Sequence, residues 1–567
     1  MTSHPLLPLQ VQADYRRKGY WEGITLAEVV AGHAAKHPER AAIVGPVPLT
    51  YSELYTRARR LAGYLVDAGV QPGEFLLAVQ SNSWQGVVLS VAASVAGIAL
   101  SPLSSRVSPT LALNLFEQVG CRGVLLESDL LQRPEWRELF DALRSRASCR
   151  HVLLSGPVAN DLPQYGSLPT LEHACTTGRE ISQRAKDPSR PALVLTTGGS
   201  TGVPKSVVHC EEALIFAGRS FGRSTDFTAD DVYVAFGPYG HASGSVFDVY
   251  MPLLSGASIL PNARWKAQPV AEAISRYGGT YCITVGTHVF DMLALESGTE
   301  PLLKSMRLVV SGAGPDHLFV DAERRFGFRV VRDYGLSECL GHAPGRPGDA
   351  AEVRLHKDGV PFPGHEYRIT EPGTLNPVPL GQAGEYVCRG PSLFMGYFGQ
   401  PELTRAALTE DGFYRTGDLM IATEDGYLSC AGRIKDVIRR GGLQIDVLEM
   451  ERLLAEHAKI AEVVVVGIAH PRLGEQAVIV AIAKVDSDRP RLEDLVAHLV
   501  ERGLPRECLP ERLVFTATLP RTEWGKFNRV ELRKWLAEPP AAESRPAGLT
   551  TDRSVDSLSR DGTVTRK

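Results

Sequence analysis

The sequence predicts an α/β fold with a large N-terminal domain, built from two mostly parallel βα sheets and a small β-barrel, and a small α+β C-terminal domain. From residue 50 to about 336, continuous apolar runs such as 75–79, 192–196 and 307–311 alternate with helical segments. Such runs are typical of parallel strands covered on both faces. Between 359 and 391, glycine and proline separate short segments with period-two alternation, which favours a small antiparallel barrel or sheet.

A third pattern begins after residue 432 and predicts the separate α+β domain. It contains a helix at 448–457, apolar strands near 462–468 and 477–485, and an amphipathic helix near 492–500. We therefore predict a large domain at 1–432, with subregions of about 1–190, 191–355 and 356–432, and a small domain at 433–537. The segment 538–567 is too polar to fold alone and is predicted to be a disordered tail.

Two local patterns predict individual helices in the first subregion. Thr50 and Glu53 have the spacing of a capping box and begin a helix with an apolar face that ends near Gly69. The apolar stretch at 86–100 is shorter than the ~20 residues that a bilayer requires, so we expect a buried core helix and no membrane span.

Composition excludes several classes of protein. The chain has 567 residues, a formal net charge of −4 and 44% hydrophobic residues, as expected for a globular protein. The charge is near neutral and there is no long basic run, so we expect no nucleic-acid partner. The nine cysteines include no CxxC pair, so their spacing predicts neither a zinc cluster nor a disulfide framework. Without a signal-peptide pattern, the expected location is the cytoplasm.

The segment 195–209, LTTGGSTGVPKSVVH, carries the strongest sign of chemistry. A strand leads into glycines and hydroxyl residues, and Lys205 follows Pro204. Glycines let backbone N–H groups approach an anion, and hydroxyls and a lysine add further contacts, so the segment suits a polyphosphate. Val203 and Pro204 separate Gly202 from the lysine, unlike in a Walker A motif, and the following residues are extended. A hairpin loop is therefore expected.

This loop resembles the phosphate loop of the adenylate-forming superfamily, which includes acyl-CoA and aryl-CoA ligases, peptide-synthetase adenylation domains and luciferase. The resemblance is closest to an acyl- or aryl-acid CoA ligase and extends from about 15 to 536. Further motifs follow in the family's order: PYGHASG at 238–244, SGAGP at 311–315, DYGLSE at 333–338, YRTGD at 414–418, GRIKD at 432–436 and PRTEWGK at 520–526.

The resemblance implies a role for each matching residue. Lys526 is the implied catalytic cation, Glu338 the magnesium ligand and Lys435 the hinge, while Ser337 and His241 complete the implied catalytic set. The implied nucleotide- and CoA-binding residues are Thr196, Thr197, Gly198, Gly199, Ser200, Thr201, Gly202, Lys205, Gly312, Ala313, Gly314, Asp333, Tyr334, Gly335, Leu336, Asp418, Arg433 and Gly442. Candidate acid-binding residues are Phe236, His241, Ser245, Gly286, Thr287, Ser311, Gly312 and Cys339.

The implied reaction has two steps and uses ATP, Mg²⁺ and CoA. A carboxylic acid first forms an acyl-AMP, and a thiol then displaces AMP. Members that activate α-amino acids have an aspartate after the histidine of the 238–244 motif, whereas this chain has Ala242 there. An aryl, alicyclic or medium-chain acid is therefore expected, and the resemblance is compatible with a homodimer. Two alternatives stay open: transfer to a carrier-protein thiol, and a catalytically silent nucleotide-binding protein.

Overall fold

The computed structural model describes residues 5–184, 186–197, 205–312, 314, 316–440, 443–445, 447–472, 474–521, 527–537 and 550–551. The predicted site residues Gly198, Gly199, Ser200, Thr201, Gly202, Ala313, Gly442 and Lys526 lie outside these ranges. The chain divides into two compact units. Unit 1 comprises Met1–Arg368, Val387–Thr416 and Ala422–Ser429, and unit 2 comprises Ile369–Tyr386, Gly417–Ile421 and Cys430–Lys567. The domain boundaries inferred from the sequence stay predictions.

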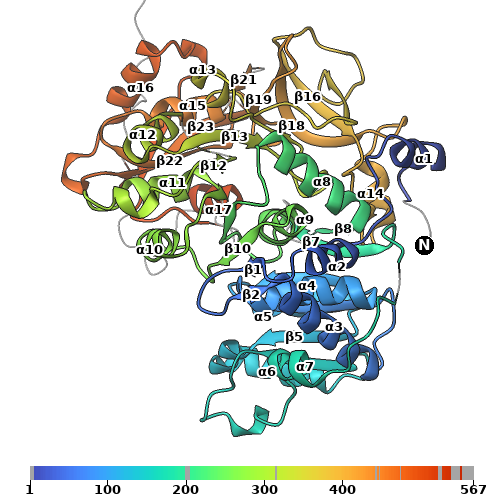
Figure 1. Cartoon of the computed structure of the whole chain (residues 1–567). Coiled ribbons are helices and arrows are strands. Elements are labelled where there is room, and N and C mark those ends of the chain that lie inside the picture. Colours follow the sequence, from blue (N-terminus) through green and yellow to red (C-terminus); the bar gives the residue numbers. More distant parts are fainter. Residues whose placement is uncertain are drawn as a thin grey trace, which may run out of the picture. The chain divides into compact units, whose positions relative to one another are not determined.

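Unit 1 contains a seven-stranded sheet with the order β17-β8-β7-β4-β3-β5-β6 (Figure 1). Its strands are β3 (Phe75–Gln80), β4 (Ala99–Ser104), β5 (Gly123–Glu127), β6 (His151–Ser155), β7 (Pro191–Thr197), β8 (Lys205–Cys210) and β17 (Gly396–Tyr397). The strands from β7 to β6 in this order pair in parallel, as predicted.

Helices cover both faces of this sheet because successive strands are added first on one side of β3 and then on the other. β4 and β5 lie on opposite sides of β3, so right-handed crossovers place the helices that follow β3 and β4 on opposite faces. The first face carries α3 (Tyr51–Asp67), α4 (Trp84–Ala96) and α7 (Leu171–Thr177), and α3 packs against the other two. The second face carries α5 (Pro109–Val119) and α6 (Pro134–Arg144).

An eight-stranded sheet of unit 1 has the order β14-β13-β12-β11-β9-β10-β1-β2. Its strands are β1 (Ala41–Ile43), β2 (Leu49–Thr50), β9 (Val232–Ala235), β10 (Ser258–Pro261), β11 (Tyr281–Thr284), β12 (Leu308–Ser311), β13 (Arg329–Tyr334) and β14 (Ala343–Pro344). The strands from β13 to β1 pair in parallel.

Two groups of helices accompany this sheet. α10 (Ala267–Tyr277), α11 (Gly286–Leu293) and α12 (Asp316–Phe326) follow one another along it in Figure 1 and contribute to one apolar core. α8 (Glu211–Ser224), the π-helix at Ser243–Tyr250 and α9 (Met251–Ser255) pack together as the second group. The chain thus builds the two covered, mostly parallel sheets that the apolar runs predicted.

The glycine- and proline-rich region forms a four-stranded sheet with the order β15-β16-β18-β19. These strands are β15 (Glu366–Thr370), β16 (Ala383–Arg389), β18 (Tyr414–Ala422) and β19 (Leu428–Arg433). The short strand β17, which follows β16 in the chain, instead pairs with β8 in the seven-stranded sheet. This pairing brings Tyr397 next to β8.

Unit 2 contains a sheet with the order β21-β20-β23-β24-β25, in which β22 also pairs with β23. Its strands are β20 (Ile438–Arg440), β21 (Leu443–Ile445), β22 (Ile460–His470), β23 (Gly474–Ala483), β24 (Arg512–Phe515) and β25 (Thr550–Thr551). Alternate residues of β22 enter two separate cores: Val463 and Val465 pack with α15 (Val447–Ala455) and α16 (Leu492–Glu501), whereas Val464 and Val466 pack with α17 (Arg529–Ala537). Because successive side chains of a strand point to opposite faces, an unbroken valine run needs cover on both sides.

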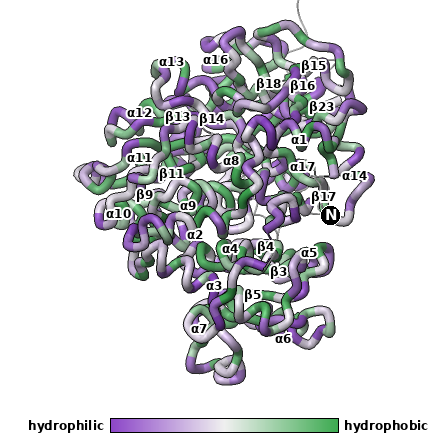
Figure 2. The backbone as a smooth tube through the Cα atoms, turned by 45° about the vertical axis from the view of Figure 1, so that its right-hand side comes forward, coloured by the Kyte–Doolittle hydropathy of each residue, from purple (hydrophilic) through white to green (hydrophobic). Residues whose placement is uncertain are grey.

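Local predictions in unit 1 are also confirmed. The Thr50 Oγ1 accepts a hydrogen bond from the Glu53 backbone N–H at 3.2 Å, and Glu53 accepts one from the Thr50 N–H at 2.8 Å. The apolar stretch at 86–100 forms α4 and the start of β4, and the tube around α4 is mostly green in Figure 2. Within the described ranges, no helix is long and apolar enough to cross a bilayer.

A buried carboxylate ties together three strand entrances of the eight-stranded sheet. Asp231, just before β9, accepts hydrogen bonds from the Thr228 N–H, the Thr280 hydroxyl and the Arg307 guanidinium, with the Arg307 contacts at 2.6 and 2.7 Å. Burial alone would raise the pKa of Asp231, but these donors together outweigh burial and hold the pKa below its ordinary value of 3.8.

We predict that Asp231→Asn lowers the free energy of unfolding by about 2 kcal/mol at pH 7 because a charged hydrogen-bond network is broken. A depressed folded-state pKa stabilises the fold above the ordinary pKa of 3.8, and this contribution is lost as pH falls through the folded value. The difference between wild type and variant in urea denaturation should therefore be constant from pH 7 to about 5 and shrink below about 4. Asp230→Asn, at an exposed neighbour, is the matched control. Equal loss in both variants would contradict the role of Asp231.

Candidate functional site

The predicted phosphate loop connects two paired strands. β7 and β8 are antiparallel, with Thr196 opposite Ser206 and Thr197 opposite Lys205, so the predicted hairpin is confirmed. Thr196 is 2% exposed, and its hydroxyl has no hydrogen-bond partner among the described residues. The hairpin therefore presents a buried hydroxyl and a lysine at its end, both of which suit an anionic ligand.

A tyrosine that the sequence analysis missed, Tyr397, contacts both Lys205 and the predicted magnesium ligand Glu338. β17 pairs with β8, with Tyr397 opposite Val207. The Lys205 Nζ lies 4.8 Å from the centroid of the Tyr397 ring, and the Tyr397 hydroxyl donates a hydrogen bond of 2.7 Å to the Glu338 Oε1. The hydroxyl of Tyr414, at the start of β18, lies 3.4 Å from that of Tyr397.

The segment that carries Ser337 and Glu338 is held by two further contacts. The His209 Nε2 lies 2.7 Å from the Ser337 carbonyl oxygen. The Phe394 backbone N–H donates to the Glu338 carbonyl oxygen at 2.8 Å. Both partners come from β8 or from the residues leading into β17, so the same pairing that places Tyr397 also positions Glu338.

Two of the predicted nucleotide-binding segments lie at neighbouring strand ends. β11, β12 and β13 are parallel, and Thr284 pairs with Ser311 at the carboxyl edge. A Cβ on Gly314 would lie 2.9 Å from the Gly286 Cα, so the two segments approach more closely than a side chain permits. A Cβ on Gly312 would lie 3.4 Å from the Asp333 Oδ1.

Tyr334 and Ser311 complete this edge. Tyr334 is 8% exposed, and its ring meets that of His342 edge-on at 5.6 Å. The Ser311 hydroxyl is fully buried and has no hydrogen-bond partner among the described residues. Gly335 and Leu336 follow Tyr334 directly, and a Cβ on Gly335 would lie 2.5 Å from the Gly341 Cα. The residues that follow β12 and β13 therefore meet at one edge of the sheet.

Part of the predicted acid site forms an aromatic cluster. Phe236, at the end of β9, lies 4.7 Å from the Trp265 ring and 5.1 Å from the His288 ring. The sequence analysis missed both partners. Burial lowers the pKa of His288 to about 4, and the charge of Arg106 acts in the same direction. Since His288 follows the predicted residues Gly286 and Thr287 directly in α11, its sequence position was the available signal.

The other predicted acid-site residues have different surroundings. The His241 Nδ1 lies 2.9 Å from the Ser243 hydroxyl. The Ser245 hydroxyl accepts a hydrogen bond of 3.1 Å from the Gly240 N–H. Cys339 is fully buried, and its sulfur lies 3.4 Å from that of Cys388. The assignment of these three residues to the acid site stays a prediction.

A buried carboxylate anchors the 238–244 segment. Asp248, in the π-helix, accepts hydrogen bonds of 2.8 Å from the Tyr233 hydroxyl and from the Gly237 N–H. Burial raises the pKa of Asp248 to about 7, although these donors act in the opposite direction. The anchor fixes the turn between β9 and His241.

Unit 2 contains the predicted nucleotide-binding residues Asp418 and Arg433, and they contact each other. The Arg433 Nε forms an ion pair of 2.8 Å with the Asp418 Oδ1. Asp418 is buried on β18, and Arg433 is exposed at the end of β19. The predicted hinge residue Lys435 lies in the turn that follows and is also exposed. Asp418 and Arg433 are thus neighbours, as their shared predicted ligand requires.

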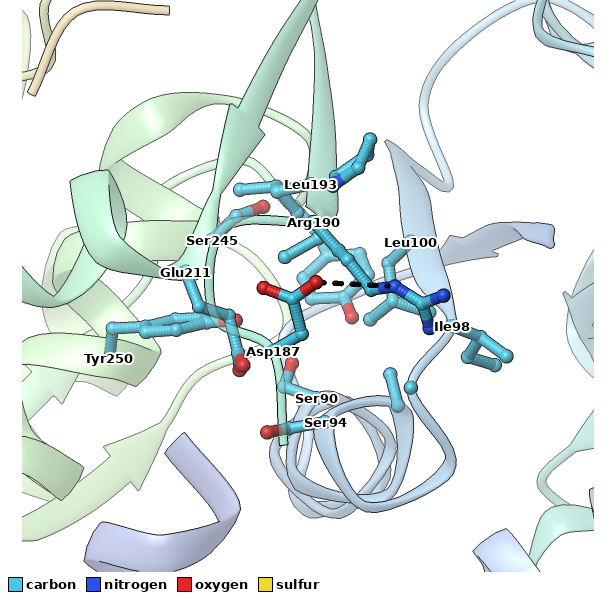
Figure 3. A pocket seen from close by; sticks show the side chains of 15 residues that line it. Ser90, Ser94, Ile98, Leu100, Asp187, Arg190, Leu193, Glu211, Ser245 and Tyr250 are labelled. Carbon is cyan, nitrogen blue, oxygen red and sulfur yellow. Dashed lines mark ion pairs between the residues drawn. The ribbon is translucent and has the colours of Figure 1, made fainter. Parts of the chain in front are cut away.

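A cavity in unit 1 lies between α4, the start of β7 and the start of α8 (Figure 3). Asp187 and Arg190 form an ion pair of 3.6 Å at its wall. The buried Glu211 also lines it, and burial raises the pKa of this carboxyl to about 7 against hydrogen bonds from Ser94 and the Leu26 N–H. Among the predicted site residues, Ser245 alone lines this cavity, so it is separate from the clusters described above.

The described residues fit a nucleotide with a divalent cation. Glu338 is buried, and no described lysine or arginine forms an ion pair with it. A hard cation prefers such a carboxylate oxygen. The buried hydroxyls of Thr196 and Ser311 offer donors at the ends of β7 and β12. Glu338 would hold Mg²⁺, which neutralises phosphate charge when it is bound.

Comparison with known proteins identifies the family. The model for AMP-binding enzymes matches residues 30–398, and the model for their C-terminal domain matches residues 449–526. The chain is 32% identical to a salicyl-AMP ligase / salicyl-S-ArCP synthetase of Mycobacterium tuberculosis over 92% of each chain. It is 28% identical to a medium-chain fatty-acid–CoA ligase of Escherichia coli over 93% of each chain.

The fold is similar to that of ATP-bound MatB from Rhodopseudomonas palustris. The TM-score is 0.80 at 24% identity, and the match covers 90% of this chain and 98% of that one. The chain therefore belongs to the AMP-binding enzymes, the adenylate-forming superfamily that its motifs resemble.

Proposed function

We propose that the protein is an AMP-forming acid–CoA ligase. In the first step, a carboxylate oxygen of the acid attacks the α-phosphorus of ATP, so that acyl-AMP forms and pyrophosphate leaves. In the second step, the CoA thiol attacks the acyl carbon, loses its proton and expels AMP. The products are an acyl-CoA thioester, AMP and pyrophosphate.

The contact between Lys205, Tyr397 and Glu338 carries this proposal. It joins the end of the predicted phosphate loop to the predicted magnesium ligand, although these residues are far apart in the sequence. Phosphoryl-group chemistry depends on fixed cations and a metal around the phosphate oxygens. Lys205 provides the fixed cation, and the buried Glu338 carboxylate provides a ligand for the metal. Both contact Tyr397.

The remaining roles follow from the position of each group. Tyr334 is proposed to stack on adenine, Asp418 and Arg433 to bind the ribose hydroxyls, and Ser337 to donate to the α-phosphate. Lys526 is proposed to bridge the acid carboxylate and the α-phosphate in the transition state. The turn at Lys435 is proposed to act as the hinge that moves the C-terminal domain between the two steps.

An aryl, alicyclic or medium-chain acid is the proposed substrate class. The cluster of Phe236, Trp265 and His288 offers apolar ring surface, and the lowered pKa of His288 keeps its imidazole neutral at pH 7. Ala242 provides no carboxylate for a substrate ammonium group. Both features favour an acid with an uncharged body.

The acceptor thiol is tested by comparing free CoA with a phosphopantetheinylated carrier protein. Pyrophosphate release from a panel of carboxylic acids identifies an active acid, and mass spectrometry then measures thioester formation on each acceptor. We expect efficient formation of acyl-CoA. Faster loading of the carrier would establish the alternative, a ligase that loads a carrier protein. The relative from Mycobacterium tuberculosis is named as a synthetase of this kind, salicyl-S-ArCP synthetase. If no acid in the panel produced pyrophosphate exchange, the result would favour the second alternative, a catalytically silent nucleotide-binding protein.

We predict that Lys526→Ala lowers the rate of acid-dependent pyrophosphate exchange about 10²–10³-fold because one charge that stabilises the transition state is lost. Thioester formation from supplied acyl-AMP should survive, since the lysine acts in the first step only. Lys534→Ala, at an exposed position on α17, is the matched control and should keep both half-reactions. Equal loss of both half-reactions in Lys526→Ala would refute the assigned role.

We also predict that Tyr397→Phe raises the Mg²⁺ concentration for half-maximal adenylation about tenfold because a group that orients a metal ligand is lost. The rate at saturating Mg²⁺ should change little, which separates this positioning role from a loss of folded enzyme. Tyr427→Phe removes a comparable tyrosine–carboxylate hydrogen bond, to Asp349, and serves as control. An unchanged Mg²⁺ dependence in Tyr397→Phe would show that its hydroxyl does not orient the ligand.

A further inference from the structure

Two cysteines and a histidine from separate segments meet inside unit 1. Cys339 and His342 lie in the segment between β13 and β14, and Cys388 lies on β16. Their ligand atoms all lie within 4.8 Å of one another, and each residue is fully buried. The mechanism above gives this cluster no role, and the sequence analysis names only one member, Cys339, as a candidate acid-binding residue.

We propose that Cys339, His342 and Cys388 bind one Zn²⁺ ion in a structural site. Two thiolates and an imidazole are ligands that zinc prefers, and mixed sulfur and nitrogen sets are typical of tetrahedral zinc. Two Zn–S bonds form as the two thiols release their protons to solvent, and the imidazole donates a nitrogen lone pair. The resulting Zn²⁺ and two thiolates carry no net charge, which suits a buried position.

The sulfur separation fits zinc better than a disulfide. The two sulfurs lie 3.4 Å apart. Sulfurs about 2.3 Å from a tetrahedral zinc ion are about 3.8 Å apart, so they need to separate by only about 0.4 Å. A disulfide requires about 2.05 Å, a shift of more than 1 Å in the opposite direction. The existing arrangement is therefore nearer to the metal-bound geometry.

His365 packs against His342 but is not one of the three residues whose ligand atoms lie within 4.8 Å of one another. Its ring centroid lies 4.9 Å from that of His342, and its buried Nδ1 has no hydrogen-bond partner among the described residues. Its Nε2 lies 2.9 Å from the Ser392 hydroxyl, which donates a hydrogen bond of 2.6 Å to the Cys339 carbonyl. These contacts tie His365 and Ser392 to the backbone of a proposed ligand.

Zinc at this position would stabilise the segment that follows Glu338. Cys339 is the next residue after Glu338, and Cys388 anchors the cluster to a strand of a different sheet. Binding to the folded state alone would therefore raise thermal stability in proportion to zinc affinity. This proposal does not depend on which acid or acceptor thiol the enzyme uses.

The test measures zinc in the full-length, untagged protein after growth with added zinc and purification without chelators. We expect inductively coupled plasma mass spectrometry to find about one zinc ion per chain. Zinc should be lost in Cys388→Ala and kept in Cys282→Ala, which removes a buried thiol of β11. Cobalt added to the apo protein should produce a thiolate-to-metal charge-transfer band.

Wild-type measurements keep the proposal testable if Cys388→Ala does not fold. Wild-type protein without zinc, even after incubation with the ion, would overturn it. Zinc retained in Cys388→Ala would overturn it as well, because the metal would then lie elsewhere. A Cys339–Cys388 disulfide found by peptide mass spectrometry in the purified protein would show a redox pair in place of a metal site.

Discussion

The pairing of β17 with β8 is the constraint on which the candidate nucleotide site depends. β17 is only two residues long, yet it places the Tyr397 ring beside Lys205 and its hydroxyl on Glu338. The residues leading into it also hold the Glu338 backbone through the Phe394 N–H. A short strand suffices here because its partner β8 is buried in a seven-stranded sheet and supplies the rigidity.

Parallel sheet geometry explains why the rest of the site assembles from distant residues. The carboxyl ends of β11, β12 and β13 share one edge, so segments that are separate in the sequence converge there. Glycines at 286 and 314 permit the final approach because a Cβ would collide with the facing backbone. Buried carboxylates hold the loops at the strand ends. Asp231 binds residues just before β9, β11 and β12, and Asp248 binds the backbone of the segment before His241.

The cysteine and histidine cluster begins at Cys339, the residue that follows Glu338 in the chain. Apolar residues usually fill such a position, whereas here two thiols and the His342 imidazole meet in a fully buried place. The cluster connects the segment after Glu338 to β16, and the Ser392 hydroxyl bridges His365 to the Cys339 carbonyl. The metal proposal and the ligase proposal thus concern the same segment but rest on separate contacts.

The sequence by itself determined the α/β class, the positions of several strands, the hairpin pairing of β7 with β8 and the order of the nucleotide motifs. These features depend on local periodicity, capping and turn chemistry, which a few neighbouring residues specify. Only the tertiary structure revealed Tyr397, Trp265 and His288 as partners of predicted residues and the meeting of Cys339 with Cys388. Those contacts join segments far apart in the chain, and the register of β17 on β8 or the course of a loop, which no local pattern encodes, decides which side chains meet.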